Sequence, residues 1–336
     1  MKKIVFGILF IGVGMVNAAY AGTLDSVKEK GMLNCGATQG VVGFSVPDEN
    51  NRWTGFDVDF CRAVAAAIFN DPDKVKFVPL SGKERFTALQ SGEIDLLSRI
   101  TTDTMSRDTT LGLNFIDVMY YDGQGLMVRK TLGVKDGKEL SGATVCTDTG
   151  TTTELNLADF FKANKLEYKP VVFEKVDEQV AAYDAGRCDV LSTDISGLQA
   201  YRAKLKNPDE NMVLPNVISK EPLAPVVRQG DDGWQDLVRW TRNCIINAEE
   251  LGVTSKNVAE MKKSTNPAIK RLLGVEGEFG KSVGLSEEWC ANAIEKVGNY
   301  GEIYDRNLGP KAQISIKRGL NNLWNNGGIL YAAPIR

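Results

Sequence analysis

The chain has 336 residues, of which 43% are hydrophobic and 25% are charged, and its formal net charge is −3. This composition excludes collagen-like, low-complexity and disordered chains, and the weak negative charge gives no reason to expect nucleic acid or an anionic membrane as a partner. The absence of histidine excludes imidazole-based catalysis and zinc sites with a histidine ligand. We therefore expect no metal and no cofactor, and the length predicts two domains.

The first 21 residues have the pattern of a secretory signal peptide. Lys2 and Lys3 precede an apolar run from Ile4 to Val16, and Ala19-Tyr20-Ala21 provides small residues at a cleavage site. The alternative, a retained membrane anchor, needs about 20 apolar residues, and this run is shorter. We expect cleavage after Ala21 and an exported, soluble mature protein.

Export decides how the six cysteines are interpreted, because disulfides persist in an oxidising compartment. No CxxC motif occurs, so neither a thioredoxin-type motif nor a zinc knuckle is indicated. Six cysteines can pair in many ways, and free buried thiols are the alternative. We favour pairing between neighbours in chain order, because each pair then closes a loop within one segment: Cys35–Cys61, Cys146–Cys188 and Cys244–Cys290.

The mature chain alternates β-branched runs with amphipathic helices, which predicts an α/β fold with parallel strands. The first unit is predicted to contain, in chain order, a strand, a helix, a strand, a helix and a strand. Its second helix ends at a glycine, Gly92. The predicted strands are Leu33–Ala37, Val75–Pro79 and Ile94–Ser98, and the predicted helices are Asp57–Phe69 and Lys83–Ser91.

A second unit downstream follows the same plan. A shift of 94 residues places Ala88–Ser98 on Ala182–Ser192, with identical residues at five of the eleven positions. The chain therefore predicts two similar lobes. The strands of the second unit are Ala143–Thr147, Tyr168–Phe173 and Cys188–Thr193, and its helices are Thr152–Ala163 and Val176–Ala185. Beyond residue 230, amphipathic helices are predicted at Trp234–Glu250 and Ser286–Val297.

Ligands of such sheets bind beyond the carboxyl ends of the strands, which directs attention to three stretches: Ser98–Arg107, Thr147–Thr153 and Ser192–Asp194. Arg107 can pair with a carboxylate, and a helix that begins at the threonine cluster presents free N–H groups to an anion. Asp194 can receive an ammonium group. Together they suit the zwitterionic head of an α-amino acid. The alternatives are a surface ion pair for Arg107 and helix capping for Asp194 and the threonines.

At these residues the chain resembles the periplasmic solute-binding proteins of polar amino-acid ABC transporters (solute-binding family 3). The motifs that carry this resemblance are Gly55-Phe56-Asp57-Val58-Asp59, Leu89-Gln90-Ser91-Gly92 with Asp95, Arg107, Thr149-Gly150-Thr151 and Asp189 to Asp194. Two further motifs, Glu221 to Arg228 and the ending Gly327 to Arg336, narrow the resemblance to the general L-amino-acid-binding branch. The resemblance covers nearly the whole mature chain.

The resemblance implies a type II periplasmic binding protein with two βαβ-type lobes joined by a two-strand hinge. Lobe one would comprise residues 22–129 and 229–336, including a helical C-terminal extension, and lobe two residues 130–228. The crossings are expected near Met127–Leu132 and Leu223–Gln229. It also implies a soluble periplasmic monomer that binds an L-amino acid and delivers it to an ABC transporter permease.

The resemblance further implies roles for single residues. Arg107 would grip the ligand α-carboxylate, with Thr102 and the backbone N–H of Thr152, while Asp194 and the carbonyl of Ile100 would receive the ammonium group. Two arginines, Arg85 and Arg99, would favour glutamate, aspartate or a γ-glutamyl peptide, the alternative for each being a solvated or structural role. Many relatives have an aromatic wall just after the first strand, where this chain has Gln39–Gly43, and this difference leaves more room in the pocket for the ligand side chain.

Two other functions remain open on the sequence. Some periplasmic dehydratases acting on arogenate or prephenate share the fold and the carboxylate grip, although no distinctive general acid is found here. A sensory module that docks on a receptor is not distinguished by sequence. No P-loop motif occurs, so an ATPase would have to be another chain.

Overall fold

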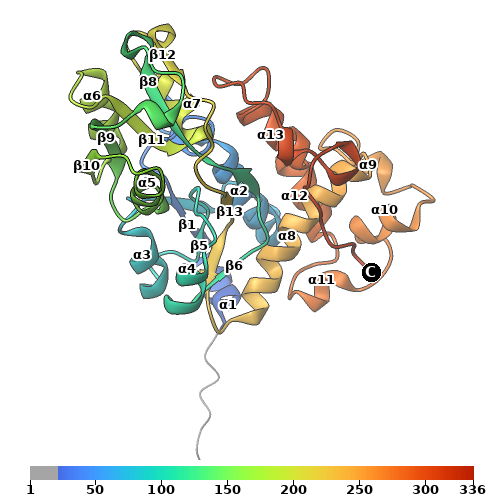
Figure 1. The fold of residues 1–336 in the computed structure, drawn as a ribbon. Helices are drawn as coiled ribbons and strands as arrows, with labels where there is room; N and C mark the ends of the chain where they lie inside the picture. Colours follow the sequence, from blue (N-terminus) through green and yellow to red (C-terminus); the bar gives the residue numbers. More distant parts are fainter. Residues whose placement is uncertain (1–21) are drawn as a thin grey trace, which may run out of the picture.

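Two five-stranded sheets form the cores of two lobes (Figure 1). The computed structural model describes residues 22–336, so the expected signal peptide lies outside the described residues. The first sheet, in lobe one, contains β4 (Val75–Pro79), β1 (Leu33–Ala37), β5 (Leu96–Leu97), β14 (Val226–Arg228) and β6 (Leu113–Phe115), in that order. The second, in lobe two, contains β10 (Tyr168–Phe173), β9 (Ala143–Asp148), β11 (Val190–Asp194), β8 (Gln124–Arg129) and β12 (Asn211–Val213).

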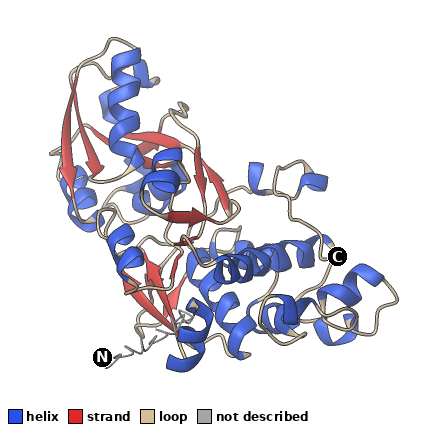
Figure 2. Ribbon diagram, turned by 90° about the horizontal axis from the view of Figure 1, so that it is seen from below, coloured by secondary structure: helices blue, strands red, loops and turns tan. Residues whose placement is uncertain are grey.

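The two sheets share one topology, as the internal repeat predicts. In each, the first three strands are parallel, and the fourth, β14 or β8, runs antiparallel to its neighbours. Helices lie beside the strands in both lobes (Figure 2), so a strand such as β11 is buried along its whole length. These helices are α2 (Phe56–Phe69), α3 (Arg85–Ser91), α5 (Thr152–Ala163), α6 (Val176–Asp184) and α7 (Ile195–Arg202).

Two short strands connect the lobes. β7 (Tyr120–Asp122) pairs antiparallel with β13 (Glu221–Leu223) in a two-stranded ribbon. The expected crossings and the boundaries at residues 129 and 228 therefore need correction, because β8 already belongs to the second sheet and β14 to the first. The apolar run within β8 is apolar because it is buried in lobe two, and a buried strand and a crossing strand look alike in sequence.

The C-terminal helices extend lobe one. Helix α12 packs on α2 and on α8. The α8 residue Trp234 is buried, and its indole Nε1 donates a hydrogen bond to the backbone oxygen of Asp95 at 3.0 Å. These helices are α8 (Asp232–Glu250), α9 (Val258–Met261), α10 (Pro267–Leu272), α11 (Phe279–Ser282), α12 (Trp289–Val297) and α13 (Tyr300–Asn307). The remaining elements are α1 (Thr23–Lys30), β2 (Val46–Pro47), β3 (Trp53–Thr54) and α4 (Met105–Thr110), with five short 3₁₀ turns.

Three disulfides hold neighbouring elements together, and their pairing is the one expected from chain order. Cys35–Cys61 joins β1 to α2, Cys146–Cys188 joins β9 to the residues before β11, and Cys244–Cys290 joins α8 to α12. They close loops of 26, 42 and 46 residues. Loops of this size stabilise a fold by about 3–4 kcal/mol each in the chain-entropy model. Among residues 22–336, no helix has the length and apolar character needed to cross a membrane.

Candidate functional site

A cavity between the lobes is lined by residues from both of them. Six of the seven predicted ligand-binding residues lie there, and only Arg107 does not line it. The residues lining it from lobe one are Val41, Arg85, Arg99, Ile100 and Thr102, and those from lobe two are Asp148, Thr151, Thr152, Thr153, Val176, Thr193, Asp194 and Tyr201. Val41 comes from the loop where relatives were expected to have an aromatic wall. In this chain the cavity (hereafter the cleft cavity) has a small aliphatic residue at that place.

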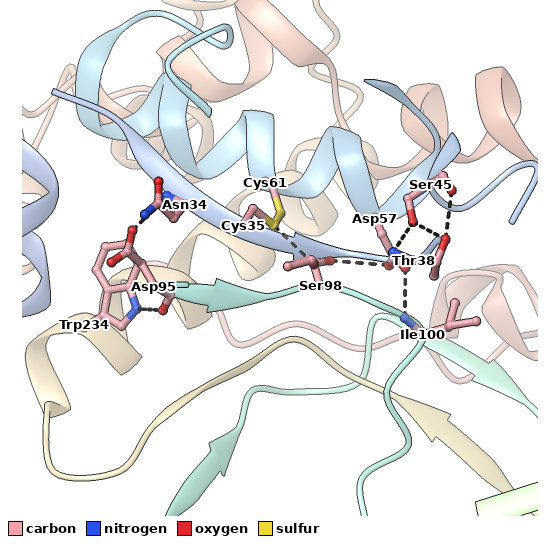
Figure 3. The surroundings of a disulfide bond; sticks show 11 residues. Asn34, Cys35, Thr38, Ser45, Asp57, Cys61, Asp95, Ser98, Ile100 and Trp234 are labelled. Atoms are coloured by element: carbon pink, nitrogen blue, oxygen red, sulfur yellow. Dashed lines mark hydrogen bonds between the residues drawn. A yellow bond between two sulfur atoms is a disulfide. The ribbon is translucent and has the colours of Figure 1, made fainter. Parts of the chain in front are cut away.

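The turn after β5 is held in an unusual backbone conformation. Ile100 has φ of 38°, a left-handed value that is uncommon outside glycine, and its N–H donates to the Asp57 carboxylate at 2.9 Å (Figure 3). Asp57 stands in the first turn of α2, which the Cys35–Cys61 disulfide ties to β1. Burial raises the pKa of Asp57 to about 7, against hydrogen bonds from Ile100 and Ser98 that lower it. No described N–H donates to the Ile100 carbonyl, which is thus available to a ligand.

Three buried arginines belong to the lobe-one side of the site, of which Arg85 and Arg99 line the cleft cavity. Arg85, Arg99 and Arg107 are 2%, 5% and 8% exposed, and burial lowers the pKa of each, that of Arg107 to about 10. Within the described residues none of the three takes part in an ion pair. Arg99 donates through Nε to the Leu80 carbonyl at 3.0 Å, whereas the Arg85 Nε has no hydrogen-bond partner. Three unpaired guanidinium groups give this wall a strong positive potential.

Arg107 lies behind the cavity wall. Its Nη1 donates to the backbone oxygen of Thr102 at 2.9 Å, and its guanidinium carbon is 5.2 Å from the centre of the Phe86 ring. The Arg85 guanidinium carbon lies 4.9 Å from the same ring. Phe86 therefore contacts both cations, with Arg85 at the cavity and Arg107 beside Thr102. The alternative of a surface ion pair for Arg107 does not occur, because the residue is buried and unpaired.

The lobe-two wall contributes buried carboxylates. Asp194 ends β11 and precedes α7, but its side chain makes no capping hydrogen bond, so the capping alternative does not hold. Its pKa is raised well above the usual value, by burial first and then by the neighbouring charges of Asp122 and Glu221. Asp148, at the end of β9, has a pKa raised by burial to about 6, against the lowering effect of Arg99 and Arg85. The Asp148 Oδ1 is buried without a hydrogen-bond partner.

Glu221, on the connecting ribbon, was missed by the sequence reasoning. It is 1% exposed and accepts hydrogen bonds from Thr102 Oγ1 at 2.6 Å and from Thr152 Oγ1 at 3.0 Å. Asn156 Nδ2 donates to its other oxygen at 2.7 Å. One hinge carboxylate thus contacts a threonine from each lobe. The sequence signals were its place in the motif Glu221 to Arg228, which was given no ligand role, and its position just before the expected crossing at Leu223–Gln229.

The lobes are in contact on both sides of the cleft cavity. Lys204 of lobe two donates to the Gly40 carbonyl of lobe one at 2.7 Å, and Lys83 of lobe one pairs with Glu174 of lobe two at 3.2 Å. The space within the cavity that is open to the centre of a water molecule is about 20 Å³. The structure is therefore a closed form, and a ligand larger than water must enter while the lobes are apart.

The charges of the closed cleft are divided between its walls. Cations come from lobe one and carboxylates from lobe two and the ribbon, and the described side chains form no ion pair between the two sets within hydrogen-bonding reach. Charges buried without partners are unfavourable, so a ligand that carries both signs gains by pairing with both walls. Among residues 22–336, no group of three or more histidine, cysteine, aspartate or glutamate side chains is arranged to hold a metal ion.

Comparison with known proteins finds relatives that match nearly the whole chain. The chain is 60% identical to the general L-amino acid-binding periplasmic protein AapJ of Rhizobium johnstonii, over 98% of this chain and 97% of that protein. It is 52% identical to the glutamate/glutamine/aspartate/asparagine-binding protein BztA of Rhodobacter capsulatus, over 100% of this chain and 99% of that one.

A solved structure, an ABC transporter/periplasmic binding protein from Brucella ovis with glutathione bound, superposes with a TM-score of 0.92 at 56% identity, covering 94% of this chain and 100% of that one. The family model for bacterial extracellular solute-binding proteins, family 3, matches residues 33–274. The chain belongs to this family of bacterial extracellular solute-binding proteins.

Proposed function

We propose that the protein binds L-amino acids in the periplasm by closure of the two lobes and delivers them to an inner-membrane ABC permease. The observation that carries the proposal is the pair of opposite, unpaired charges that the two lobes present to one closed cavity. An α-amino acid carries a carboxylate and an ammonium group a few ångströms apart, which is the charge pattern that these walls complement.

Each predicted residue has a role in the proposal. Arg107 attracts the α-carboxylate, which also accepts hydrogen bonds from Thr102 and from the backbone N–H of Thr152 at the start of α5. Asp194 and the free carbonyl of Ile100 receive the ammonium group. Arg85 and Arg99, which line the cavity, would favour a second carboxylate, as in glutamate, aspartate or a γ-glutamyl peptide.

The known relatives support a binding function. One is named for general L-amino-acid binding, one for glutamate, glutamine, aspartate and asparagine, and a solved relative holds glutathione. All three are described as binding or transport proteins, which favours a binding role over the dehydratase alternative. Export through a signal peptide cleaved after Ala21 belongs to the same proposal, as does a monomeric mature protein.

Closure is the working step. A ligand that contacts both walls binds the closed form more tightly than the open form and so shifts the population toward it. The β7–β13 ribbon would serve as the hinge, because it connects the lobes directly. The closed form is the shape that a permease would recognise.

The test is calorimetric titration of the ligand-free mature protein and of Arg107→Ala with L-glutamate and L-glutamine. Removal of the guanidinium should lower the affinity at least about a hundredfold, because a buried charge-assisted pair is lost. Arg187→Ala is the matched control, since Arg187 is an exposed arginine of lobe two. An unchanged affinity in a folded Arg107→Ala protein would contradict the assigned site, and no binding of any L-amino acid to the wild type would contradict the function.

A further inference from the structure

An unpaired donor and an unpaired acceptor face the cleft cavity from opposite lobes. Arg85 begins α3 in lobe one, and Asp148 ends β9 in lobe two. Both line the cavity. The Arg85 Nε and the Asp148 Oδ1 are buried without hydrogen-bond partners. Buried polar atoms of this kind are rare in native proteins, so each one calls for an explanation.

The two side chains do not satisfy one another. The charge of Arg85 lowers the pKa of Asp148, and the charge of Asp148 raises that of Arg85, which shows that the groups lie in each other's field. Yet they form neither an ion pair nor a hydrogen bond. A guanidinium donor and a carboxylate acceptor thus line the same cavity without pairing, and a ligand group that reaches both of them must enter while the lobes are apart.

Few chemical groups satisfy a donor and an acceptor at once. A second carboxylate accepts from an arginine but is repelled by an ionised aspartate. A second ammonium group donates to the aspartate but is repelled by the arginine. A carboxamide suits both, because its carbonyl oxygen accepts from the guanidinium while its N–H donates to the carboxylate. An aliphatic side chain would leave both groups unpaired.

We propose that Arg85 and Asp148 together recognise a carboxamide of the ligand, with Arg85 donating to its carbonyl oxygen and Asp148 accepting from its N–H. This inference rests on the proposed function, since the α-amino-acid head is held elsewhere in the cleft cavity. The carboxamide is either the side-chain amide of glutamine or asparagine or the peptide bond of a γ-glutamyl compound. Either group contacts both lobes and adds to the stability of the closed form.

The test compares affinities for L-glutamine, γ-glutamylglycine, L-glutamate and L-alanine, measured by calorimetry at pH 8 on the wild type and on Asp148→Asn. The substitution keeps the size of the side chain and replaces the charged acceptor by an amide. We expect the ratio of the affinity for an amide ligand to that for L-glutamate to fall at least about fivefold, as expected for loss of a hydrogen bond to a charged group. Asp159→Asn, an exposed aspartate on α5, is the control and should leave every ratio unchanged.

The four ligands separate the possible results. A fall confined to γ-glutamylglycine identifies the peptide bond as the recognised group, and a fall confined to L-glutamine identifies the side-chain amide. An unchanged ratio for both amides, in a variant that still binds L-alanine, overturns the role of Asp148 while leaving amino-acid binding intact. A wild-type protein that binds none of the four ligands overturns the proposed function itself, and this inference with it.

Discussion

At the scale of single residues, the cleft depends on charges kept from water and from one another. The Arg85 and Arg99 guanidinium groups and the Asp148 and Asp194 carboxylates are buried, yet none of these four forms an ion pair among the described residues. Such an arrangement is unfavourable for stability and useful for binding, because the ligand supplies the missing partners. The site therefore resembles a preorganised receptor, because the unfavourable free energy of burying these charges arises during folding and not during ligand binding.

The buried carboxyl of Asp57 should make stability depend on pH. Its pKa is about 7 in the folded protein and 3.8 ordinarily, so between these values the folded protein holds a proton that the unfolded chain has lost. Stability then falls as the pH rises through this interval. Asp57→Asn keeps an acceptor for Ile100 and removes this titration. Between pH 4.5 and pH 8, urea unfolding should show the wild type losing at least about 1 kcal/mol more than the variant.

Equal losses in the wild type and Asp57→Asn would contradict the raised pKa of Asp57. The comparison between the two proteins is needed because Asp148 and Asp194 also have raised pKa values and contribute a loss of the same sign. Their contributions are present in both proteins and cancel in the difference.

The residues that line the cleft cavity were largely predictable. Parallel strands end at one edge of a sheet, so Thr102, Thr152 and Asp194 were expected to converge from their places after predicted strands. Glu221 was not found, because its role arises from the pairing of two crossing strands that are distant in sequence. Asp148 was placed in a candidate stretch but given no role, since its unpaired state depends on where Arg85 points.

At the scale of elements, two loops from opposite lobes, one containing Gly82 and one containing Gly150, come close together. A Cβ atom at Gly82 would lie 3.0 Å from Thr151 Cγ2 and 3.1 Å from the Thr149 carbonyl oxygen, both across the cleft. Gly150 has φ of +70°, and a Cβ there would lie 3.3 Å from the Lys83 Cα. Glycine at these two positions lets the backbones of the lobes meet.

We predict that Gly82→Val hinders closure without disturbing either lobe. The added branched side chain would collide with Thr151 only in the closed form, so ligand affinity should fall about tenfold or more while the unfolding midpoint stays within the wild-type range. Gly233→Val, in the exposed first turn of α8, is the control, because no atom lies closer than 3.8 Å to its Cβ position. Titration calorimetry measures the ligand affinity, and small-angle scattering with and without ligand measures closure of the lobes. An affinity equal to that of the control would contradict this role for Gly82.

Element type was predicted better than element limits. The helices α2, α5 and α8 and the strands β1, β4 and β10 lie close to where they were predicted, although β4 and β10, the first strands of the two sheets, contain no fully buried residue. The third strand of lobe one was expected at Ile94–Ser98, but β5 is limited to Leu96–Leu97. The hinge was misplaced by several residues because the lobe to which β8 belongs is decided by its pairing with β11 and β12, not by the apolar residues Leu126–Val128 at its centre.

At the scale of the whole molecule, each lobe is braced by disulfides of its own. One disulfide ties β1 to α2, one lies within lobe two, and the third joins two helices of the C-terminal extension. No disulfide crosses the cleft. The lobes are connected by the β7–β13 ribbon, by polar contacts and by apolar packing, because one cluster of buried side chains includes residues of both lobes.

The central claim is that an L-amino acid is held in the cleft cavity by groups of opposite charge from the two lobes. The most direct measurement is a crystal structure of the mature protein with L-glutamine. We predict that the ligand ammonium nitrogen lies within about 3.2 Å of the Asp194 carboxylate, and the ligand carboxylate within the same reach of the Arg107 guanidinium. A ligand bound outside the cleft cavity, or held there with neither contact, would contradict the account.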